Sequence, residues 1–207
     1  MDDWATILSL GSGYVALMDG QVVGAMCMTS FGEVAATSLL IVDDKMRGRG
    51  LGDNLMNLAL EVSGGRECRL ISTTAGLHLY RKLGFREIET IHAHQGTVSP
   101  IQAADGIEWT TRDDFNQICD IDRSATGIER RTLMSALWET GRYAVIRDSG
   151  QIVGYSALFW YGRGENAGPV IGRNTDEARR LLSFLFSHLL AHSFASTSVS
   201  RRGSQIG

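Results

Sequence analysis

Two mostly apolar runs lie on either side of a two-residue turn within the first thirty residues. Residues 14–18 and 21–29 flank Asp19-Gly20, and Asp-Gly between two such runs is a strong signal for a β-hairpin. The apolar run 38–42 predicts a third strand. A helix then follows, because apolar residues recur at helical spacing at Leu51, Leu55, Leu58, Ala59 and Val62 and stop before Gly64-Gly65.

The same reading extends the first unit to about residue 95. Residues 68–73 are mostly apolar and predict a strand, and residues 75–83 predict a short helix that ends at Gly84, with Phe85 opening the next strand. Residues 86–94 alternate again and predict a late strand of the same unit. Residues 1–95 are therefore expected to form one domain of mixed α/β type.

A second unit repeats this theme after a polar linker at residues 96–107. Helices are predicted from Thr111 to about Asp122 and from Thr132 to Trp138. The hairpin around Ser149-Gly150 then echoes the one around Asp19-Gly20, which indicates an internal repeat. The second domain is predicted to span residues 108–192.

The end of the second unit has two features of its own. Asn174 with Glu177 is a plausible capping box for a helix over residues 178–190. The tail at residues 193–207 is rich in serine, arginine and glycine, and its composition is typical of disorder. The closing strands of this unit are expected to be absent.

Between the third strand and the first long helix lies a turn with three glycines and two arginines, Arg47-Gly48-Arg49-Gly50-Leu51-Gly52. Backbone N–H groups and the positive end of a helix dipole meet at such a turn, which favours binding of a phosphate or pyrophosphate. The turn is not a Walker loop, because the chain contains no Gly-Lys-Ser or Gly-Lys-Thr. It also departs from the dinucleotide pattern, because Asp53 stands where the third glycine belongs.

The turn instead satisfies Arg/Gln-x-x-Gly-x-Gly/Ala at every position, and it resembles the acetyl-CoA loop of the GNAT acetyltransferase superfamily. A second motif supports the resemblance at the expected distance, since Ala75 to Phe85 is similar to the family's A-x-x-L-Y-x-x-x-G-F segment. The resemblance covers about residues 14–95. It implies a mostly antiparallel mixed sheet flanked by helices, followed here by a second, degenerate GNAT-like module that lacks the glycine turn.

The resemblance also implies acetyl-CoA as cosubstrate and a primary amine as acceptor. In this family, the pyrophosphate would lie on Arg47, Gly48, Arg49, Gly50, Leu51 and Gly52. Backbone groups of Leu40, Ile41 and Val42 would lie beside the thioester and pantetheine, and a backbone N–H there would polarise the carbonyl. Thr73 stands where the family often has asparagine, and its hydroxyl could bond the pantetheine.

Two catalytic residues are proposed from the same comparison. Tyr80 matches the family tyrosine that points at the sulfur, and an ordinary pKa near 10 leaves its hydroxyl able to donate a proton. Glu33, at the start of the third strand, is the first candidate for the base that takes the proton from the amine. Asp43, Asp44 and His78 are weaker candidates, because charges near turns are usually only solvated.

A domain of this family opens with a strand and two helices, whereas about a dozen residues precede Tyr14, enough for the tail of one helix at residues 4–8. The chain is therefore expected either to be truncated at its N-terminus or to have the gap filled by a partner or by the second domain. The sequence also leaves open whether the protein forms a homodimer. The acceptor is not readable from the sequence.

Composition narrows the remaining possibilities. The net charge of −3 offers no basic surface for nucleic acid, and no apolar run reaches the roughly 20 residues of a membrane span. Three scattered cysteines (Cys27, Cys68 and Cys119) and an acidic start without a signal peptide favour the cytosol. The histidine pairs His92/His94 and His188/His192 lack a third ligand, so no metal site is expected.

Three functions remain open from the sequence. An acetyl-CoA-dependent N-acetyltransferase is the leading hypothesis. A non-catalytic acyl-CoA-binding or regulatory module is the alternative, because no convincing base is seen. The third is a structural half that binds nothing until a partner completes it.

Overall fold

The computed structural model describes residues 3–99, 101–162, 164–189 and 194–200. Its internal contacts divide the chain into two units, Met1–Ile88 and Glu89–Gly207. Each unit has its own sheet and its own apolar core, as the internal repeat in the sequence indicates.

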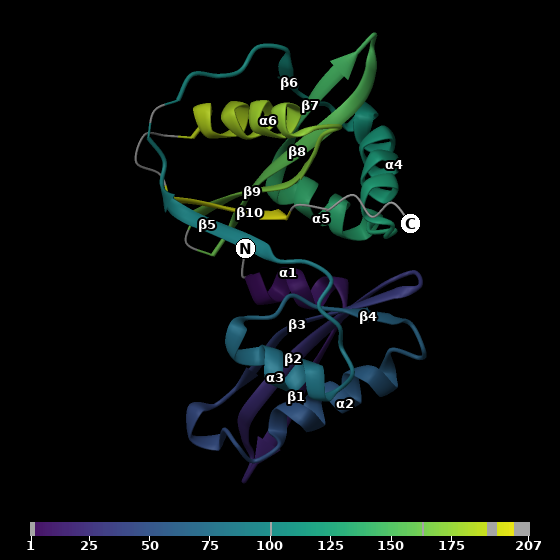
Figure 1. Ribbon diagram of the computed structural model, residues 1–207, viewed down its shortest axis with the longest axis vertical. Helices are drawn as coiled ribbons and strands as arrows, with labels where there is room; N and C mark the ends of the chain where they lie inside the picture. Colours follow the sequence, from purple (N-terminus) through teal and green to yellow (C-terminus); the bar gives the residue numbers. More distant parts are fainter. Residues whose placement is uncertain (1–2, 100, 163, 190–193, 201–207) are drawn as a thin grey trace. The chain divides into compact units, whose positions relative to one another are not determined.

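The first unit contains a four-stranded sheet in the order β1–β2–β3–β4 (Figure 1). Its elements are α1 (Asp3–Leu10), β1 (Ser12–Met18), β2 (Gln21–Phe31), β3 (Val34–Val42), the 3₁₀ turn Asp44–Met46, α2 (Leu51–Val62), β4 (Glu67–Arg69), the 3₁₀ turn Thr74–Gly76 and α3 (Leu77–Lys82). The strands β1, β2 and β3 are antiparallel, and β4 is parallel to β3.

The predicted hairpin is confirmed. Asp19 and Gly20 have φ angles of 50° and 76°. Positive φ at both central residues matches the right-handed twist of the flanking strands, and aspartate and glycine tolerate it better than other residues. The turn fixes the register in which Met18 faces Gln21.

The core of the first unit lies between the sheet and α2. Met26, Met56 and Ala59 are fully buried, and Leu55 is 3% exposed. The predicted apolar stripe of this helix is therefore correct in its middle and wrong at its end, because Val62 is 37% exposed. The helix presents the 55–56–59 face to the sheet, and Val62 lies on its last turn, beyond that contact.

The second unit contains a six-stranded sheet in the order β5–β10–β9–β8–β7–β6 (Figure 1). Its elements are β5 (Ile91–Thr97), β6 (Ile107–Trp109), the 3₁₀ turn Arg112–Asp114, α4 (Phe115–Thr126), α5 (Arg131–Thr140), β7 (Gly141–Asp148), β8 (Gln151–Tyr161), β9 (Gly164–Ile171), α6 (Thr175–Ser187) and β10 (Phe194–Ser200). The helices predicted around 111–122, 132–138 and 178–190 are confirmed, with shifts of a few residues at their ends.

Helices cover both faces of this second sheet. Along β7 all four of Tyr143, Ala144, Val145 and Ile146 are buried. Successive side chains of a strand point to opposite faces. Tyr143 and Val145 accordingly pack with α4 and α5, and Ala144 and Ile146 pack with α6. A strand covered on both faces reads as a continuous apolar run, as this one does.

The internal repeat is confirmed at the level of strand register. The pair Ala25–Ile41 in the first sheet corresponds to Tyr155–Ile171 in the second, with both members 130 residues later. The register shift in the first hairpin, between Ala16 and Leu17, recurs between Ile146 and Arg147. The two units thus share backbone irregularities as well as strand order.

Two predictions about strands are wrong. The late strand expected at residues 86–94 forms at Ile91–Thr97, and it pairs antiparallel with β10 of the second unit. The tail expected to be disordered contains β10 at Phe194–Ser200, which lies between β9 and β5. The closing strands of the second unit are therefore present. Alternation marks a segment as a strand but does not select its partner, and serine-rich composition hid a strand that neighbours on both sides stabilise.

Two smaller differences concern the segment after α2. The strand predicted over residues 68–73 is limited to Glu67–Arg69, and Phe85 does not open a strand. Gly84, with φ of 88°, ends the helix as predicted. Phe85 instead packs against the core, and its ring contacts that of Tyr80 edge-on, with centroids 5.9 Å apart.

Candidate functional site

The glycine turn between β3 and α2 has the backbone that an anion site requires. Gly48 and Gly50 have φ angles of 76° and 78°, and a Cβ at either position would meet no heavy atom within 4 Å. Gly50 is the N-cap of α2 and makes no side-chain capping bond. The first N–H groups of α2 are thus not capped by the N-cap side chain, and they lie at the positive end of the helix dipole, where negatively charged groups bind favourably.

The third glycine serves packing. A Cβ on Gly52 would lie 3.3 Å from Leu79 Cδ2 on α3. A larger residue would push α3 away from α2. Gly52 thus allows α3, the helix that carries Tyr80, to pack closely against the start of α2.

Charged side chains around the turn are paired on the surface. Arg47 Nη2 lies 2.6 Å from Asp44 Oδ1, and both side chains are exposed. Lys82 Nζ lies 2.7 Å from Asp53 Oδ1, so a cation from α3 offsets the one acidic side chain in the first turn of α2. Exposed pairs of this kind are weak and exchange readily. Arg47 and exposed Arg49 are thus available to an incoming anion.

A β-bulge interrupts β3 before it reaches the turn. Leu39 has φ of 54°, an unusual value for a leucine. Ile41 pairs with Ala25 and Ser38 with Cys27, so Leu39 and Leu40 together face Met26 alone. The residues predicted to lie beside the thioester are Leu40, Ile41 and Val42. Leu40 lies in this bulge, whereas Ile41 and Val42 pair with β2. Bulges re-aim backbone groups next to active sites.

A pocket of about 220 Å³ opens beside the bulge. Strand β4 pairs with β3 only at Val34–Ala36, so beyond those residues the two chain segments separate. The residues that line the pocket come from β3, from the segment after β4 and from α3: Thr37, Ser38, Leu39, Leu40, Ile71, Thr73 and Tyr80. The fold thus brings together three of the site residues that the sequence predicts, Leu40, Thr73 and Tyr80.

Tyr80 of α3 lines the pocket. Its side chain is half-buried and packs against the core of the first unit. Burial raises the pKa of Tyr80 above the ordinary value near 10, because the anion would lose hydration. A Cβ on Gly76 would lie 2.9 Å from Tyr80 Cε2, so glycine leaves room for the ring.

The structure does not bring the predicted bases to this pocket. Glu33 is exposed in the turn before β3, six residues ahead of Leu39 in the bulge, which is roughly 20 Å along a strand. Asp43 Oδ1 accepts a bond of 2.8 Å from Lys45 N, and Asp44 pairs with Arg47. His78 is exposed and outside the lining. The residues lining the pocket include neither a carboxylate nor an imidazole.

Sequence reasoning missed four lining residues, Thr37, Ser38, Leu39 and Ile71. Leu39 forms part of the bulge of β3, and an apolar strand sequence carries no sign of a bulge. A weak signal was the threonine at position 37, a polar residue in a buried strand.

The second unit has lost the corresponding features. The position of Leu39 is occupied 130 residues later by Pro169, which has no N–H to donate. Only Gly172, Arg173 and Asn174 separate β9 from α6, in place of the long glycine turn.

At the start of α6, side chains accept hydrogen bonds from the free backbone N–H groups. Asn174 Oδ1 accepts from Glu177 N at 2.9 Å, which confirms half of the predicted capping box. Glu177 Oε2 accepts from Arg173 N at 2.7 Å instead of completing the box. Arg173 also bonds the other oxygen, which lowers the pKa of Glu177. A buried carboxylate therefore occupies the place where a phosphate would bind.

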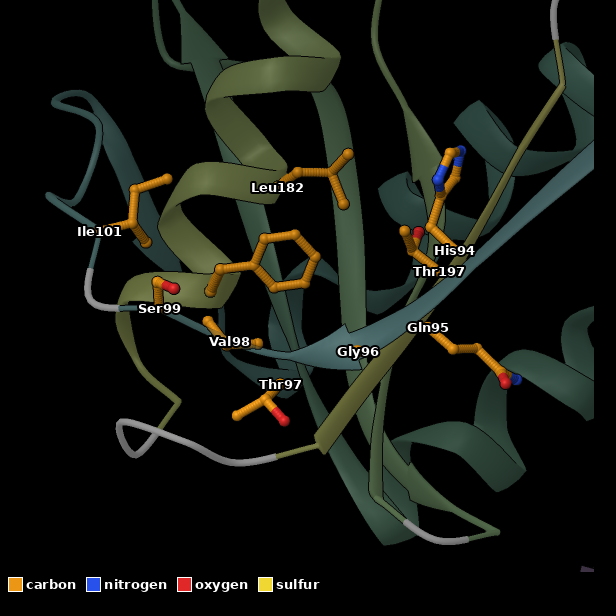
Figure 2. A pocket seen from close by; sticks show the side chains of 10 residues that line it. His94, Gln95, Gly96, Thr97, Val98, Ser99, Ile101, Leu182 and Thr197 are labelled. Atoms are coloured by element: carbon orange, nitrogen blue, oxygen red, sulfur yellow. The ribbon is translucent and has the colours of Figure 1, made fainter.

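The second unit has a pocket of its own, of about 440 Å³, between β5 and α6 (Figure 2). Figure 2 shows Leu182 above β5, Val98 at the left end of the strand and, on the right, His94 and Thr197 close together. None of the predicted site residues lines this pocket. Its lining is largely apolar and offers no set of groups for catalysis.

Two further expectations concern metals and membranes. The described residues include no group of three or more His, Cys, Asp and Glu side chains that could hold a metal ion. None of the helices in the described part of the chain is long and apolar enough to cross a membrane. His92 lies on β5, and His192 lies outside the described residues.

Comparison with protein families gives two matches. A model described as an acetyltransferase (GNAT) domain matches residues 9–87, and a second model of the same description matches residues 118–194. No curated protein gives a significant match.

Solved structures share the fold at low identity. A Pyrococcus horikoshii protein superposes with a TM-score of 0.75 at 20% identity, over 92% of this chain and 66% of its own. A GCN5-related N-acetyltransferase from Sphaerobacter thermophilus gives 0.63 at 19% identity, over 94% and 73%. A tandem GNAT protein from the clavulanic acid biosynthesis pathway gives 0.64 at 14% identity, over 97% and 79%. The chain thus spans just under two thirds of the Pyrococcus protein.

Proposed function

Because the chain belongs to the GNAT acetyltransferase superfamily, with two such domains in tandem, we propose that its first unit is an acetyl-CoA-dependent N-acetyltransferase acting on a primary amine. The observation that supports the proposal is a pocket that brings the bulge of β3 together with Tyr80, on the strand that leads into the open glycine turn. The second unit serves as a companion domain, because Glu177 and Pro169 replace the features that a CoA site needs.

The residues present fit the cosubstrate. The pyrophosphate would be held by the N–H groups of Gly50, Leu51 and Gly52 together with the side chains of Arg47 and Arg49. Gly48 and Gly50 leave open space where any side chain would stand. Thr73 would bond the pantetheine arm.

Acetyl-CoA supplies an activated acyl group: a bond forms from the amine nitrogen to the acyl carbon, the carbon–sulfur bond breaks, and an amide and free CoA result. The bulge of β3 would direct a backbone N–H at the carbonyl oxygen, an effect worth roughly 3–4 kcal/mol in acyl transfer. Tyr80 would give its proton to the leaving sulfur, and its raised pKa keeps the hydroxyl protonated at neutral pH. Water would take the proton of the attacking ammonium, since no lining residue is a base.

The experiment is a transfer assay with acetyl-CoA and a panel of small amines, polyamines, amino acids and peptides, read by free-thiol release and by mass of the product. Tyr80→Phe should slow transfer about 100-fold while acetyl-CoA affinity stays within twofold of the native protein. Tyr14→Phe is the matched control, because Tyr14 packs on the same core but does not line the pocket.

A second candidate is a non-catalytic acyl-CoA-binding module, which the lack of a carboxylate or imidazole in the lining favours. It predicts tight acetyl-CoA binding without transfer to any amine of the panel. If acetyl-CoA does not bind at all, both candidates are wrong.

A further inference from the structure

The hydroxyl of Thr37 is buried without a protein partner. Thr37 lies in β3 opposite Met28, and only 6% of its surface is exposed. Within the described residues, Thr37 Oγ1 forms no hydrogen bond. A buried polar group left unpaired is costly, and such groups in native proteins call for an explanation.

The position of this hydroxyl points to a ligand. Thr37 lines the pocket that also contains Tyr80 and the bulge residue Leu39. The glycine turn follows the carboxyl end of β3, whereas Thr37 precedes the bulge. An arm that is anchored at the turn and runs back along β3 passes the bulge before it reaches Thr37. Its reactive end, and not its phosphates, is therefore what meets the hydroxyl.

The second unit supports this reading by contrast. Ala167 occupies the position of Thr37, since Met28–Thr37 in the first sheet corresponds to Leu158–Ala167 in the second. Ala167 is 1% exposed and has no polar side-chain atom. The fold therefore does not require a hydroxyl here. The hydroxyl occurs in the unit that keeps the glycine turn and is absent from the unit that has lost it.

We propose that the Thr37 hydroxyl donates a hydrogen bond to the acyl carbonyl oxygen of the bound thioester, as a second donor beside the backbone of the bulge. The inference rests on the proposed function and deepens it. A hydroxyl that donates to this oxygen recognises the acyl group itself, so Thr37 distinguishes acyl-CoA from free CoA. The free thiol of CoA offers no carbonyl at that point.

The test is calorimetric titration of acetyl-CoA and of free CoA into the native protein, Thr37→Val and Thr37→Ser. Valine keeps the shape and removes the hydroxyl, whereas serine keeps the hydroxyl. In Thr37→Val, acetyl-CoA affinity should fall about 3- to 10-fold, the size of one neutral hydrogen bond, while free CoA affinity is unchanged. Thr37→Ser should keep most of the native preference.

An independent readout is the melting temperature, measured without ligand and with saturating acetyl-CoA. If the hydroxyl is unpaired in the free protein, Thr37→Val should raise the melting temperature, and saturating acetyl-CoA should then raise it less than in the native protein.

The outcomes distinguish the role of Thr37 from the existence of the CoA site. Equal loss for both ligands, or an unchanged preference for acetyl-CoA in Thr37→Val, overturns the role of Thr37 and leaves the CoA site intact. Failure of the native protein to bind either ligand overturns the proposed function and this inference with it.

Discussion

Replacement of Gly50 by glutamate tests the anion site with little damage to the fold. The position has φ of 78°, and a Cβ there meets no heavy atom within 4 Å. A side chain can therefore enter free space, and the cost of Gly50→Glu is the left-handed backbone of a residue with a Cβ, about 1–2 kcal/mol. The negative charge at the start of α2 returns roughly 0.3–1 kcal/mol. The free energy of unfolding should consequently fall by only about 1 kcal/mol.

The effect of Gly50→Glu on acetyl-CoA affinity should be far larger than its effect on the free energy of unfolding. Two like charges 4 Å apart at the surface of a protein repel by about 4 kcal/mol, and every 1.4 kcal/mol corresponds to a tenfold change in affinity. Screening and adjustment of a flexible side chain reduce this repulsion. We therefore expect acetyl-CoA to bind at least about 100-fold more weakly to Gly50→Glu.

Two control variants isolate the charge at the turn. Gly50→Asn carries the same backbone cost without the charge and should bind within about fivefold of the native protein, since asparagine tolerates positive φ. Gly32→Glu places the same charge at another open glycine with φ of 60°, at the opposite end of β3, and should bind normally. Higher salt should also reduce the difference in acetyl-CoA affinity between Gly50→Glu and the native protein, because salt screens the repulsion.

The assay is titration calorimetry of acetyl-CoA, with urea unfolding of each variant to establish that it folds. If folded Gly50→Glu binds acetyl-CoA within threefold of the native protein, the pyrophosphate does not lie at this turn. The assignment of Arg47 and Arg49 would then be wrong as well.

Two further predictions concern the second unit. Arg130 holds the buried carboxylate of Asp122 with two bonds of 2.7 Å, so Arg130→Ala should lower the free energy of unfolding by about 3–5 kcal/mol in urea. Arg123→Ala breaks only an exposed pair and should cost under about 1 kcal/mol; equal losses would contradict the argument. Because its bond to Arg173 lowers the pKa of Glu177, the carboxylate stabilises the fold fully above an unfolded-state pKa near 4.3, and this contribution is lost as the pH falls further. Thermal melts of Glu177→Gln and the native protein should thus differ at pH 7 and converge toward pH 3, whereas a constant difference would exclude the linkage.

Local patterns in the sequence determined most of the first unit. The Asp19-Gly20 hairpin, the glycine turn and the end of α3 at Gly84 each depend on residues adjacent in the chain. Positive φ favours glycine, aspartate or asparagine wherever it occurs, so such turns are visible in the sequence. The same holds for the repeat, because similar local sequences around positions 20 and 150 fold into similar hairpins.

Only the tertiary structure decided which distant segments meet. Strand β5 pairs with β10, about a hundred residues later, although alternation had placed it with the first unit. Glu33 and Tyr80 were both predicted to be catalytic, yet Glu33 lies outside the pocket, whereas Thr37 lines it together with Tyr80. Strand partners and pocket linings depend on packing between residues far apart in the chain, and a change of one residue in register reverses which face a side chain occupies. The sequence therefore determined the glycine turn and the family, whereas the residues that line the pocket beside Tyr80 come together only when the sheet assembles.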